Sequence, residues 1–372
     1  MNLLVTAIRG FEEYSAHEAE LLGCRAIETR QARVVLEGDY SCLYVLNNFA
    51  RTINKVLLLL SRETVQNLED IYSKALSLDY SFIKPDQSFA VRSERSGIHE
   101  FTSIDIARVV GQSIIDSYQR STGKRLKVNL DEPDIEIEAD LIGNELFISL
   151  NTTGSGLNFR EYRVYNHPSS LKPTLASSLI IMSQWEGSSF IDPFTGGATI
   201  PIEAALYAKS SPVRPSGDFL YKKLSFYDDK DEEEALKKIG KKFDLKERIV
   251  GIEVSRRHFT GALKNVSAAN LGESIDIILG DSIKIDLQRK FKFLISNPPY
   301  GIRSGRKEKV LKIYELFVKR IDKILEDDGC GVMITTEYKK LSELLGERGY
   351  KVLKVNTGLH GKLWVGAVLF KA

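Results

Sequence analysis

The polar residues with the clearest chemistry stand in the stretch NPPY, at residues 297–300, directly after the apolar run FLIS. Two consecutive prolines end a strand rigidly, because each one fixes a φ angle and removes a backbone donor. The amide oxygen of Asn297 and the carbonyl of Pro298 are then two fixed acceptors, which suit the exocyclic amine of a nucleobase. The ring of Tyr300 offers a flat face to that base. The competing interpretation is a cis-proline turn that only caps a strand.

A second candidate site follows an earlier strand, in the stretch DPFTGGATIPIEAAL. Its two glycines allow a ligand to approach the backbone closely, and the helix expected from Thr199 directs free N–H groups at that ligand. This pattern predicts a loop that binds a nucleotide cofactor, although a purely structural turn would also fit. The residues expected to contact the cofactor are Asp192, Pro193, Thr195, Gly196, Gly197, Ala198 and Thr199.

Two further strands end in acidic residues. Glu253, followed by Val254, is placed to bind the two hydroxyls of a ribose, but its distance from the glycine loop exceeds the usual ~20 residues because residues 210–246 intervene. Asp281 and Ser282 suit the edge of an adenine, and an ordinary turn is the alternative. Ligands of open α/β sheets bind at the carboxyl ends of the strands. The ordered ends Asp, Glu, Asp and Asn therefore predict one site, to which Asn297 also contributes.

The elements that must position these residues alternate along the second half of the chain. The runs SSFID, RIVGIEV, IDIILGD, KFLISN, GCGVMITT and YKVLKVN read as strands, most of them separated by helical stretches, and AVLFKA adds another. This alternation is typical of a doubly wound, mostly parallel sheet. Residues 210–246 read as an insertion at the edge of that sheet, ending in a charged helix.

The first 155 residues read as an α+β unit. We expect strands at NLLVTAIRG and ARVVLEG, a helix over residues 12–22, and a longer helix that ends at Gly123. The pair Gly143-Asn144 inside an alternating stretch predicts a hairpin. The loop-rich segment 154–173 marks the expected domain junction.

Composition limits the classes of function. The chain has 372 residues, of which 43% are hydrophobic and 27% charged, as in an ordinary soluble globular protein of two domains. It has no apolar run long enough to span a membrane and no signal peptide. The net charge of +2 means that a nucleic-acid surface must be a local patch. Cys24, Cys42 and Cys330 show no zinc spacing, so a reducing cytoplasm and no metal are expected.

Taken together, these motifs resemble known families. The pattern D-P-x-x-G-x-G-T, an acidic strand end, GD and NPPY is similar to the S-adenosylmethionine-dependent amino-methyltransferases, although Ala198 replaces the second glycine. The stretches SFAVRSERSGIHEFTSIDIARVVGQSII, KVNLDEPDIEIEADL and GLNFREYR resemble a THUMP domain, an RNA-binding module of tRNA-modifying enzymes. Over nearly the whole chain the resemblance is to tRNA guanine-N2 methyltransferases, archaeal and bacterial, that act on guanosine 6.

The resemblance implies a fold and an activity. It implies a Rossmann-like methyltransferase domain with a seven-stranded, mostly parallel sheet at residues 173–372. Before it we expect an N-terminal ferredoxin-like segment at 1–60, an α+β THUMP domain at 61–158 and a linker at 159–172. Asn297, Pro298 and Tyr300 would be the catalytic residues, transferring the methyl group directly from S-adenosylmethionine to N2 of a flipped guanosine. The expected partner is tRNA, with no DNA and no membrane, and the expected protein is a cytoplasmic monomer.

Two basic segments are candidates for contact with RNA phosphates. Arg303 and Arg306 follow NPPY, and Arg92, Arg95 and His99 belong to a polar loop of the THUMP-like part, where a structural role is the alternative for each. Other activities fit the same motifs: methylation of guanosine 10 or of ribosomal RNA, adenine-N6 methylation, and RNA binding without catalysis.

Overall fold

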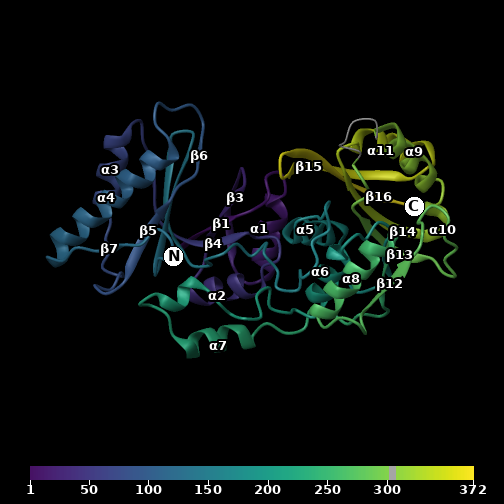
Figure 1. Cartoon of the computed structure of the whole chain (residues 1–372), viewed down its shortest axis with the longest axis horizontal. Coiled ribbons are helices and arrows are strands. Elements are labelled where there is room, and N and C mark those ends of the chain that lie inside the picture. Colours follow the sequence, from purple (N-terminus) through teal and green to yellow (C-terminus); the bar gives the residue numbers. More distant parts are fainter. Residues whose placement is uncertain (301–306) are drawn as a thin grey trace.

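Two large sheets make up the protein. The computed structural model describes residues 1–300 and 307–372. The N-terminal part of the chain forms a nine-stranded sheet and the C-terminal part a seven-stranded one, and the two lie beside each other along the long axis (Figure 1). Within the described ranges, no helix has the length and apolar character needed to cross a membrane.

The first sheet begins with the ferredoxin-like segment. Its elements are β1 (Asn2–Thr6), α1 (Glu12–Leu21), β2 (Arg25–Arg30), β3 (Arg33–Glu37), α2 (Tyr40–Phe49) and β4 (Lys55–Thr64). The expected helix over residues 12–22 is confirmed, and β2, which the sequence analysis did not predict, forms the edge of the sheet. A disulfide joins Cys24, just before β2, to Cys42 in α2. The sequence analysis did not predict this bond, because only the fold brings the two residues together.

The same sheet continues into the THUMP-like part. Its elements are α3 (Leu68–Leu76), β5 (Ser88–Arg92), β6 (Arg95–Ser96), α4 (Ser103–Thr122), β7 (Lys127–Val128), β8 (Ile135–Ile142) and β9 (Glu145–Asn151). The strand order is β2-β3-β1-β4-β9-β8-β5-β7, with β6 paired to β8. Helix α4 starts with a capping box between Thr102 and Asp105 and ends at Gly123 with a φ of 71°, as predicted. Because β4 pairs with β9, the ferredoxin-like and THUMP-like parts share one sheet and one core.

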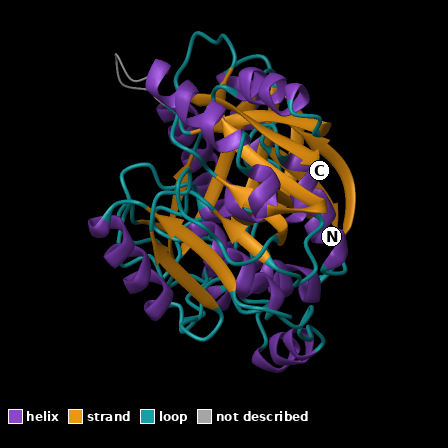
Figure 2. Cartoon of the chain, turned by 90° about the vertical axis from the view of Figure 1, so that its right-hand side faces the viewer, coloured by secondary structure: helices purple, strands orange, loops and turns teal. Residues whose placement is uncertain are grey.

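The second sheet has the predicted seven strands. Its elements are α5 (Pro173–Ser183), β10 (Phe190–Asp192), α6 (Thr199–Ala208), β11 (Ile249–Glu253), α8 (Arg256–Ala268), β12 (Ile275–Leu279), β13 (Phe291–Ser296), α9 (Lys307–Val318), α10 (Ile321–Ile324), β14 (Leu325–Thr335), α11 (Tyr338–Glu347), β15 (Lys351–His360) and β16 (Leu363–Lys371). The order is β12-β11-β10-β13-β14-β16-β15, and of these described strands only β16 runs antiparallel to its neighbours. Helices cover both faces (Figure 2).

This strand order fixes where a ligand can bind. The chain winds from β10 outward through β11 to β12 and then returns to place β13 on the other side of β10. Such a reversal leaves a crevice at the carboxyl ends of the two central strands, where the crossover helices diverge. The predicted site residues Asp192 and Asn297 therefore lie at the switch point of the sheet.

The insertion at residues 210–246 does not lie at the edge of this sheet, and that prediction is wrong. It contains η1 (Leu220–Lys223) and α7 (Asp229–Lys237), and α7 packs beside α2 of the first half (Figure 1). The Val213 amide donates to the Asn48 carbonyl over 2.7 Å, and the ring of Tyr221 lies 5.2 Å from that of Tyr44. Burial of these aromatic rings in the first core, rather than sheet pairing, decides its position.

A buried ionic cluster joins the two halves. Glu203 of α6 accepts hydrogen bonds from Arg160 Nε (2.9 Å), Arg51 Nη1 (3.0 Å) and the Tyr162 hydroxyl (2.9 Å). Glu203 is fully buried, and Arg51 and Arg160 are nearly so. Burial acts to raise the pKa of Glu203, but the two guanidinium groups outweigh it and lower this pKa to about 2. Because α6 starts at the glycine loop, the cluster ties that loop to the first half.

Candidate active site

The floor of the candidate site is the hydrogen-bonded pair of strand ends β10 and β13. Asp192 Oδ1 accepts from the Ser296 hydroxyl over 2.5 Å and from the Phe194 amide over 3.2 Å. Asp192 is only 1% exposed. Burial raises the pKa of this carboxyl to about 7, against the opposite effect of the hydrogen bonds from Ser296 and Phe194. Asp192 thus lies in the candidate site, as predicted, and a hydrogen bond from Ser296 on the neighbouring strand β13 holds its carboxyl group in place.

The glycine loop turns sharply between β10 and α6, as its sequence predicts. The φ angles of Gly196 and Ala198 are 54° and 63°, both in the left-handed region, and Ala198 is the N-cap of α6. A glycine adopts that region at little cost, whereas an alanine there is strained, so Ala198 keeps the turn of the family pattern at a cost in backbone energy. The Thr195 amide donates to the Ile252 carbonyl over 3.0 Å, so the loop is fastened to β11.

One further glycine makes this loop possible. Gly251 of β11 lies directly under Thr195, and a Cβ at residue 251 would come within 2.8 Å of the threonine hydroxyl oxygen. Any larger residue would push the loop away from the sheet. The remaining loop residues Pro193, Gly197 and Thr199 also lie at this carboxyl edge, between β10 and the first turn of α6.

The acidic ends of β11 and β12 lie next to the loop despite the long insertion. Glu253 is 8% exposed and accepts from the Ser255 amide over 2.8 Å, while Val254 beside it is 68% exposed. The Gly280 amide donates to the Glu253 carbonyl over 3.0 Å. Ser282 donates its hydroxyl hydrogen to the Pro193 carbonyl. Four strand ends therefore converge, which is what the sequence analysis predicted from their order.

The NPPY stretch leaves two polar atoms without partners. Neither Oδ1 of Asn297 nor the hydroxyl of Tyr300, both shielded from solvent, finds a hydrogen-bond partner among residues 1–300 and 307–372. A buried polar group without a partner is costly and rare, so each of these two atoms is a candidate for a hydrogen bond to a ligand. Burial raises the pKa of Tyr300 well above its usual value, so this hydroxyl stays protonated.

The peptide bonds before the two prolines are trans. No peptide bond of the described residues is cis, so the alternative of a cis-proline turn is wrong. The Pro299 carbonyl accepts from the Tyr314 hydroxyl over 2.7 Å, and Pro298 is buried. The Tyr300 ring lies edge-on to His360, with centroids 6.3 Å apart. The Tyr300 ring is also partly buried against the core of this half, so it is less open to stacking than the sequence suggested.

The segment expected to be a linker, residues 159–172, forms part of the wall of the site. The ring of His167 lies 3.5 Å from the position that a Cβ on Gly196 would occupy. The centroids of the His167 and His258 rings are 4.2 Å apart. Burial and, to a smaller degree, His258 lower the pKa of His167 to about 4. The Asn265 side chain donates to the Gly197 carbonyl over 2.9 Å. Sequence reasoning missed these residues, and the stretch YNHPSSLKP was the signal available for them.

Three of the predicted RNA contacts, Arg92, Arg95 and His99, belong to the first half. Arg92 pairs with Glu136 over 3.2 Å. Arg95 Nη1 lies 3.0 Å from Nδ1 of His99, whose other ring nitrogen is 2.8 Å from the Gly143 carbonyl. The two residues thus form one exposed cluster on the loop between β5 and α4. Arg303 and Arg306 lie outside the described residues.

The chain matches the models of three known domains, one after another along the sequence. Models of the RlmL ferredoxin-like domain, the THUMP domain and the RMKL-like methyltransferase domain match residues 2–57, 65–151 and 160–365. The last match covers more than half of the chain. The chain belongs to the RMKL-like methyltransferase family. The combination of a THUMP domain with this methyltransferase domain confirms the fold and the enzyme class expected from the sequence.

Relatives of this methyltransferase are similar over almost their whole length. A tRNA (guanine(6)-N2)-methyltransferase of Archaeoglobus fulgidus is 36% identical, over 98% of this chain and 91% of the relative. A tRNA (guanine(6)-N2)-methyltransferase of Methanocaldococcus jannaschii is 38% identical, over 95% of both chains.

Solved structures share the fold at lower identity. A possible methylase from Clostridium difficile 630 superposes with a TM-score of 0.88 at 24% identity, covering 100% of this chain and 98% of the other. TrmN from Thermus thermophilus superposes with a TM-score of 0.74 at 21% identity, covering 100% of this chain and 99% of the other. A putative methyltransferase complexed with SAH reaches 0.85 at 21% identity, covering 100% and 98%. These likenesses show the fold.

Proposed function

We propose that this methyltransferase transfers a methyl group from S-adenosylmethionine to N2 of guanosine 6 in the acceptor stem of tRNA. The observation that carries the proposal is the unpartnered, shielded Oδ1 of Asn297 among the residues described, placed at the switch point beside the glycine loop. The two archaeal relatives, both tRNA (guanine(6)-N2)-methyltransferases, support the choice of atom and of substrate.

The strand ends fit the cofactor. Glu253 has a carboxylate at the end of β11 for the two ribose hydroxyls, and Asp281 with Ser282 follows β12, where the adenine edge would lie. The left-handed Gly196 and Ala198 lead into α6, whose first-turn amide groups would donate to the rest of the molecule. When bound, S-adenosylmethionine supplies a sulfonium-activated methyl group. Val254, largely exposed, is available for contact with the adenine.

The residues of NPPY would orient the nucleophile. Asn297 Oδ1 and the Pro298 carbonyl would accept hydrogen bonds from the two N–H groups of the guanine amine, which turns the nitrogen lone pair towards the methyl carbon. Transfer would leave the cofactor as a neutral thioether, and the methylated amine would release one proton. Holding both reactants in this way removes much of the entropic part of the barrier. N2 of a paired guanine is not accessible inside a stem, so the base must leave the stack, at a cost of a few kcal/mol. Tyr300, with its protonated hydroxyl, would contact the flipped base.

The first half of the chain would choose the RNA. We keep the division into 1–60, 61–158, 159–172 and 173–372 as part of this proposal, with residues 159–172 now assigned to the wall of the site. Arg92, Arg95 and His99 would contact RNA phosphates at a distance from the flipped base, and Arg303 and Arg306, which follow NPPY in the sequence, are the other predicted RNA contacts. A monomer acting in the cytoplasm is part of the same proposal.

The test is a transfer assay with unmodified tRNA and isotopically labelled S-adenosylmethionine, followed by mass spectrometry of the nucleosides. The proposal expects label in N2-methylguanosine, and only background label with Asn297→Ala. Label in N6-methyladenosine would support the adenine-N6 alternative. Absence of label together with absence of cofactor binding in calorimetry would indicate an RNA-binding protein without catalysis.

A further inference from the structure

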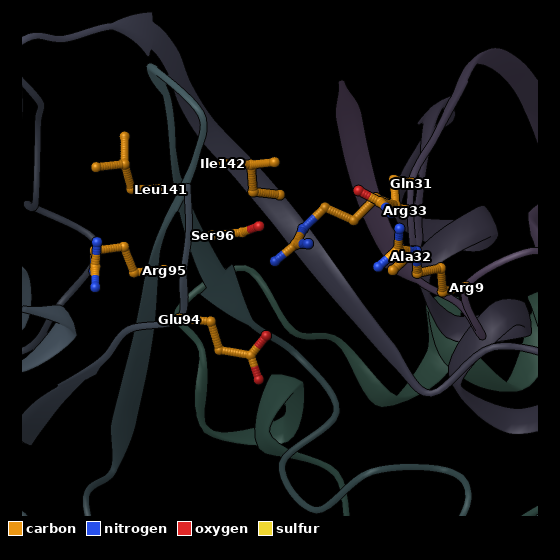
Figure 3. A pocket seen from close by; sticks show the side chains of 9 residues that line it. All are labelled: Arg9, Gln31, Ala32, Arg33, Glu94, Arg95, Ser96, Leu141 and Ile142. Carbon is orange, nitrogen blue, oxygen red and sulfur yellow. The ribbon is translucent and has the colours of Figure 1, made fainter. Parts of the chain in front are cut away.

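A pocket of about 170 Å³ lies between the ferredoxin-like and THUMP-like parts (Figure 3). That volume exceeds the ~30 Å³ share of one liquid water severalfold, so a group larger than water fits. Its two walls come from segments far apart in the sequence. The lining residues are Arg9, Gln31, Ala32 and Arg33 on one side and Glu94, Arg95, Ser96, Leu141 and Ile142 on the other.

The polar residues that line the pocket include hydrogen-bond donors suited to an anion. Arg33 is 7% exposed, and its side chain extends from β3 into the pocket (Figure 3). Its Nη2 donates to Asp140, but its Nε has no partner within the part of the chain that the structure describes. Arg9 brings a second guanidinium group to the same wall, across from the carboxylate of Glu94. The Arg95 side chain points away from the pocket (Figure 3), and its Nη1 lies 3.0 Å from Nδ1 of His99. A guanidinium N–H without a partner, beside a second arginine, is suited to a phosphate.

Arg9 also connects this pocket to the catalytic half. Its guanidinium carbon lies 5.3 Å from the centre of the Trp364 ring. The loop that carries Arg9 is fixed to β15, because the Leu359 amide donates to the Arg9 carbonyl over 2.9 Å. Two glycines permit this approach. A Cβ on Gly10 would come within 2.1 Å of the Thr357 carbonyl oxygen, and a Cβ on Gly358 would come within 2.3 Å of the Arg9 carbonyl oxygen.

Trp364 is an aromatic platform at the catalytic edge. It stands one residue after the start of β16, at the tip of the β15–β16 hairpin, and is 54% exposed. Because β15 runs in the same direction as the parallel strands, this tip lies at their carboxyl ends. The neighbouring pair in the hairpin is His360 with Leu363, and His360 contacts Tyr300. An exposed indole beside an arginine is the usual surface for stacking a nucleobase.

We propose that Trp364 and Arg9 bind the tRNA strand between the flipped guanosine and the pocket. Trp364 stacks on a base close to the target, Arg9 covers the step between the halves, and the unpartnered Nε of Arg33 donates to a backbone phosphate in the pocket. This inference rests on the proposed function, since it takes tRNA as the occupant. Positive charge together with an exposed ring favours single-stranded or frayed RNA over an acidic peptide, which would use the charge and leave the ring unpaired.

The fluorescence of tryptophan tests the stacking directly. The chain has two tryptophans, and the other, Trp185, is only 2% exposed. Saturating tRNA should quench the emission of the native protein, and Trp364→Phe, which keeps a stacking ring, should bind tRNA and show no quenching. Binding measured by anisotropy of labelled tRNA without quenching in the native protein would overturn the proposal, as would equal quenching in Trp364→Phe.

Affinity separates this surface from the catalytic site. Trp364→Ala should weaken tRNA binding roughly 5- to 100-fold, and Arg9→Ala should lower the slope of log K against log salt by about 1. Both variants should bind S-adenosylmethionine like the native protein. The control is Arg25→Ala, an exposed arginine of the same half that pairs with Glu37 over 2.9 Å and lies outside the pocket.

The outcomes distinguish the two levels of the proposal. Unchanged tRNA affinity in Trp364→Ala and Arg9→Ala, with normal transfer by the native protein, would overturn the surface and leave the proposed function intact. Quenching and weakened binding as expected, with no transfer to guanosine by the native protein, would support the surface and contradict the proposed function.

Discussion

The hydroxyl of Ser296 lies 2.5 Å from Oδ1 of Asp192, and this bond joins the carboxyl ends of β13 and β10 across the switch point. Ser296 directly precedes Asn297, and Asp192 directly precedes the glycine loop. The group assigned to the guanine amine and the loop assigned to the cofactor are therefore held by one buried contact. Their relative position does not depend on any flexible segment between the two residues.

The buried carboxyl of Asp192 predicts a dependence of stability on pH. Its folded pKa of about 7 lies above the ordinary value of 3.8, so the folded state binds the proton more tightly. The resulting stability is fully present below pH ~4 and is lost as the pH rises through about 7. A folded pKa that differs from the unfolded pKa by one pH unit corresponds to about 1.4 kcal/mol of stability.

The substitution Asp192→Asn isolates this effect, because the amide imitates the neutral carboxyl and keeps an oxygen for Ser296. Urea unfolding between pH 5 and pH 8 should show a smaller loss of stability in Asp192→Asn than in the native protein. Parallel pH profiles for the two proteins would show that Asp192 is ionised throughout this range.

Asn297→Ala should remove most methyl transfer, because one of the two acceptors for the amine is lost. Binding of tRNA should change little, since phosphate contacts dominate nucleic-acid affinity. Single-turnover transfer and filter binding of tRNA, measured side by side, check the two statements. Near-normal turnover by this variant would mean that Asn297 does not orient the nucleophile.

The cluster around Glu203 should contribute strongly to stability. Glu203→Gln removes the carboxylate that pairs directly with the buried guanidinium groups of Arg51 and Arg160, at a cost of about 3–5 kcal/mol. The matched control is Glu343→Gln, an exposed residue paired with Lys340 over 2.9 Å, for which we expect at most about 1 kcal/mol. Equal losses of unfolding free energy in both variants would contradict the account.

The cluster around Glu203 also makes the stability depend on pH, in the direction opposite to that expected from Asp192. The folded pKa of Glu203, about 2, lies below the ordinary 4.5, so its contribution is present above pH ~4.5 and is lost as the pH falls towards 2. Acid unfolding of the Glu203→Gln variant should lack this component.

The disulfide between Cys24 and Cys42 links residues 18 positions apart. Removing it by Cys24→Ser with Cys42→Ser should lower the free energy of unfolding by about 2–4 kcal/mol. A thiol reductant should destabilise the native protein in a thermal melt and leave the doubly substituted variant unaffected. If the reductant shifts neither melt, the bond does not form in the protein.

Local sequence signals predicted much of the candidate site. A strand followed by Gly196-Gly197 and a helix start at Thr199 is decided within a few residues, as is the end of α4 at Gly123. The order of the four strand ends survived the long insertion at residues 210–246, because hydrophobic runs identify buried strands whatever separates them.

The contacts that join the halves could not be predicted in this way. Glu203 and Arg51 are 152 positions apart, and β4 pairs with β9 across a whole intervening domain. A glutamate in an apolar helix shows no preference for a partner until the fold brings one. Dividing the chain near residue 165 would separate Glu203 from Arg51 and Arg160, so the methyltransferase half is not expected to be independent.

The most direct measurement of the central claim is the position of the transferred methyl group in a defined tRNA. Two unmodified transcripts are compared, identical except that one has guanosine at position 6 and the other adenosine, with the pairing restored in each. After incubation with labelled S-adenosylmethionine, mass spectrometry of nuclease fragments should show one N2-methylguanosine in the fragment containing guanosine 6 and none in the adenosine transcript. Equal labelling of both transcripts, or label on another nucleotide, would contradict the account.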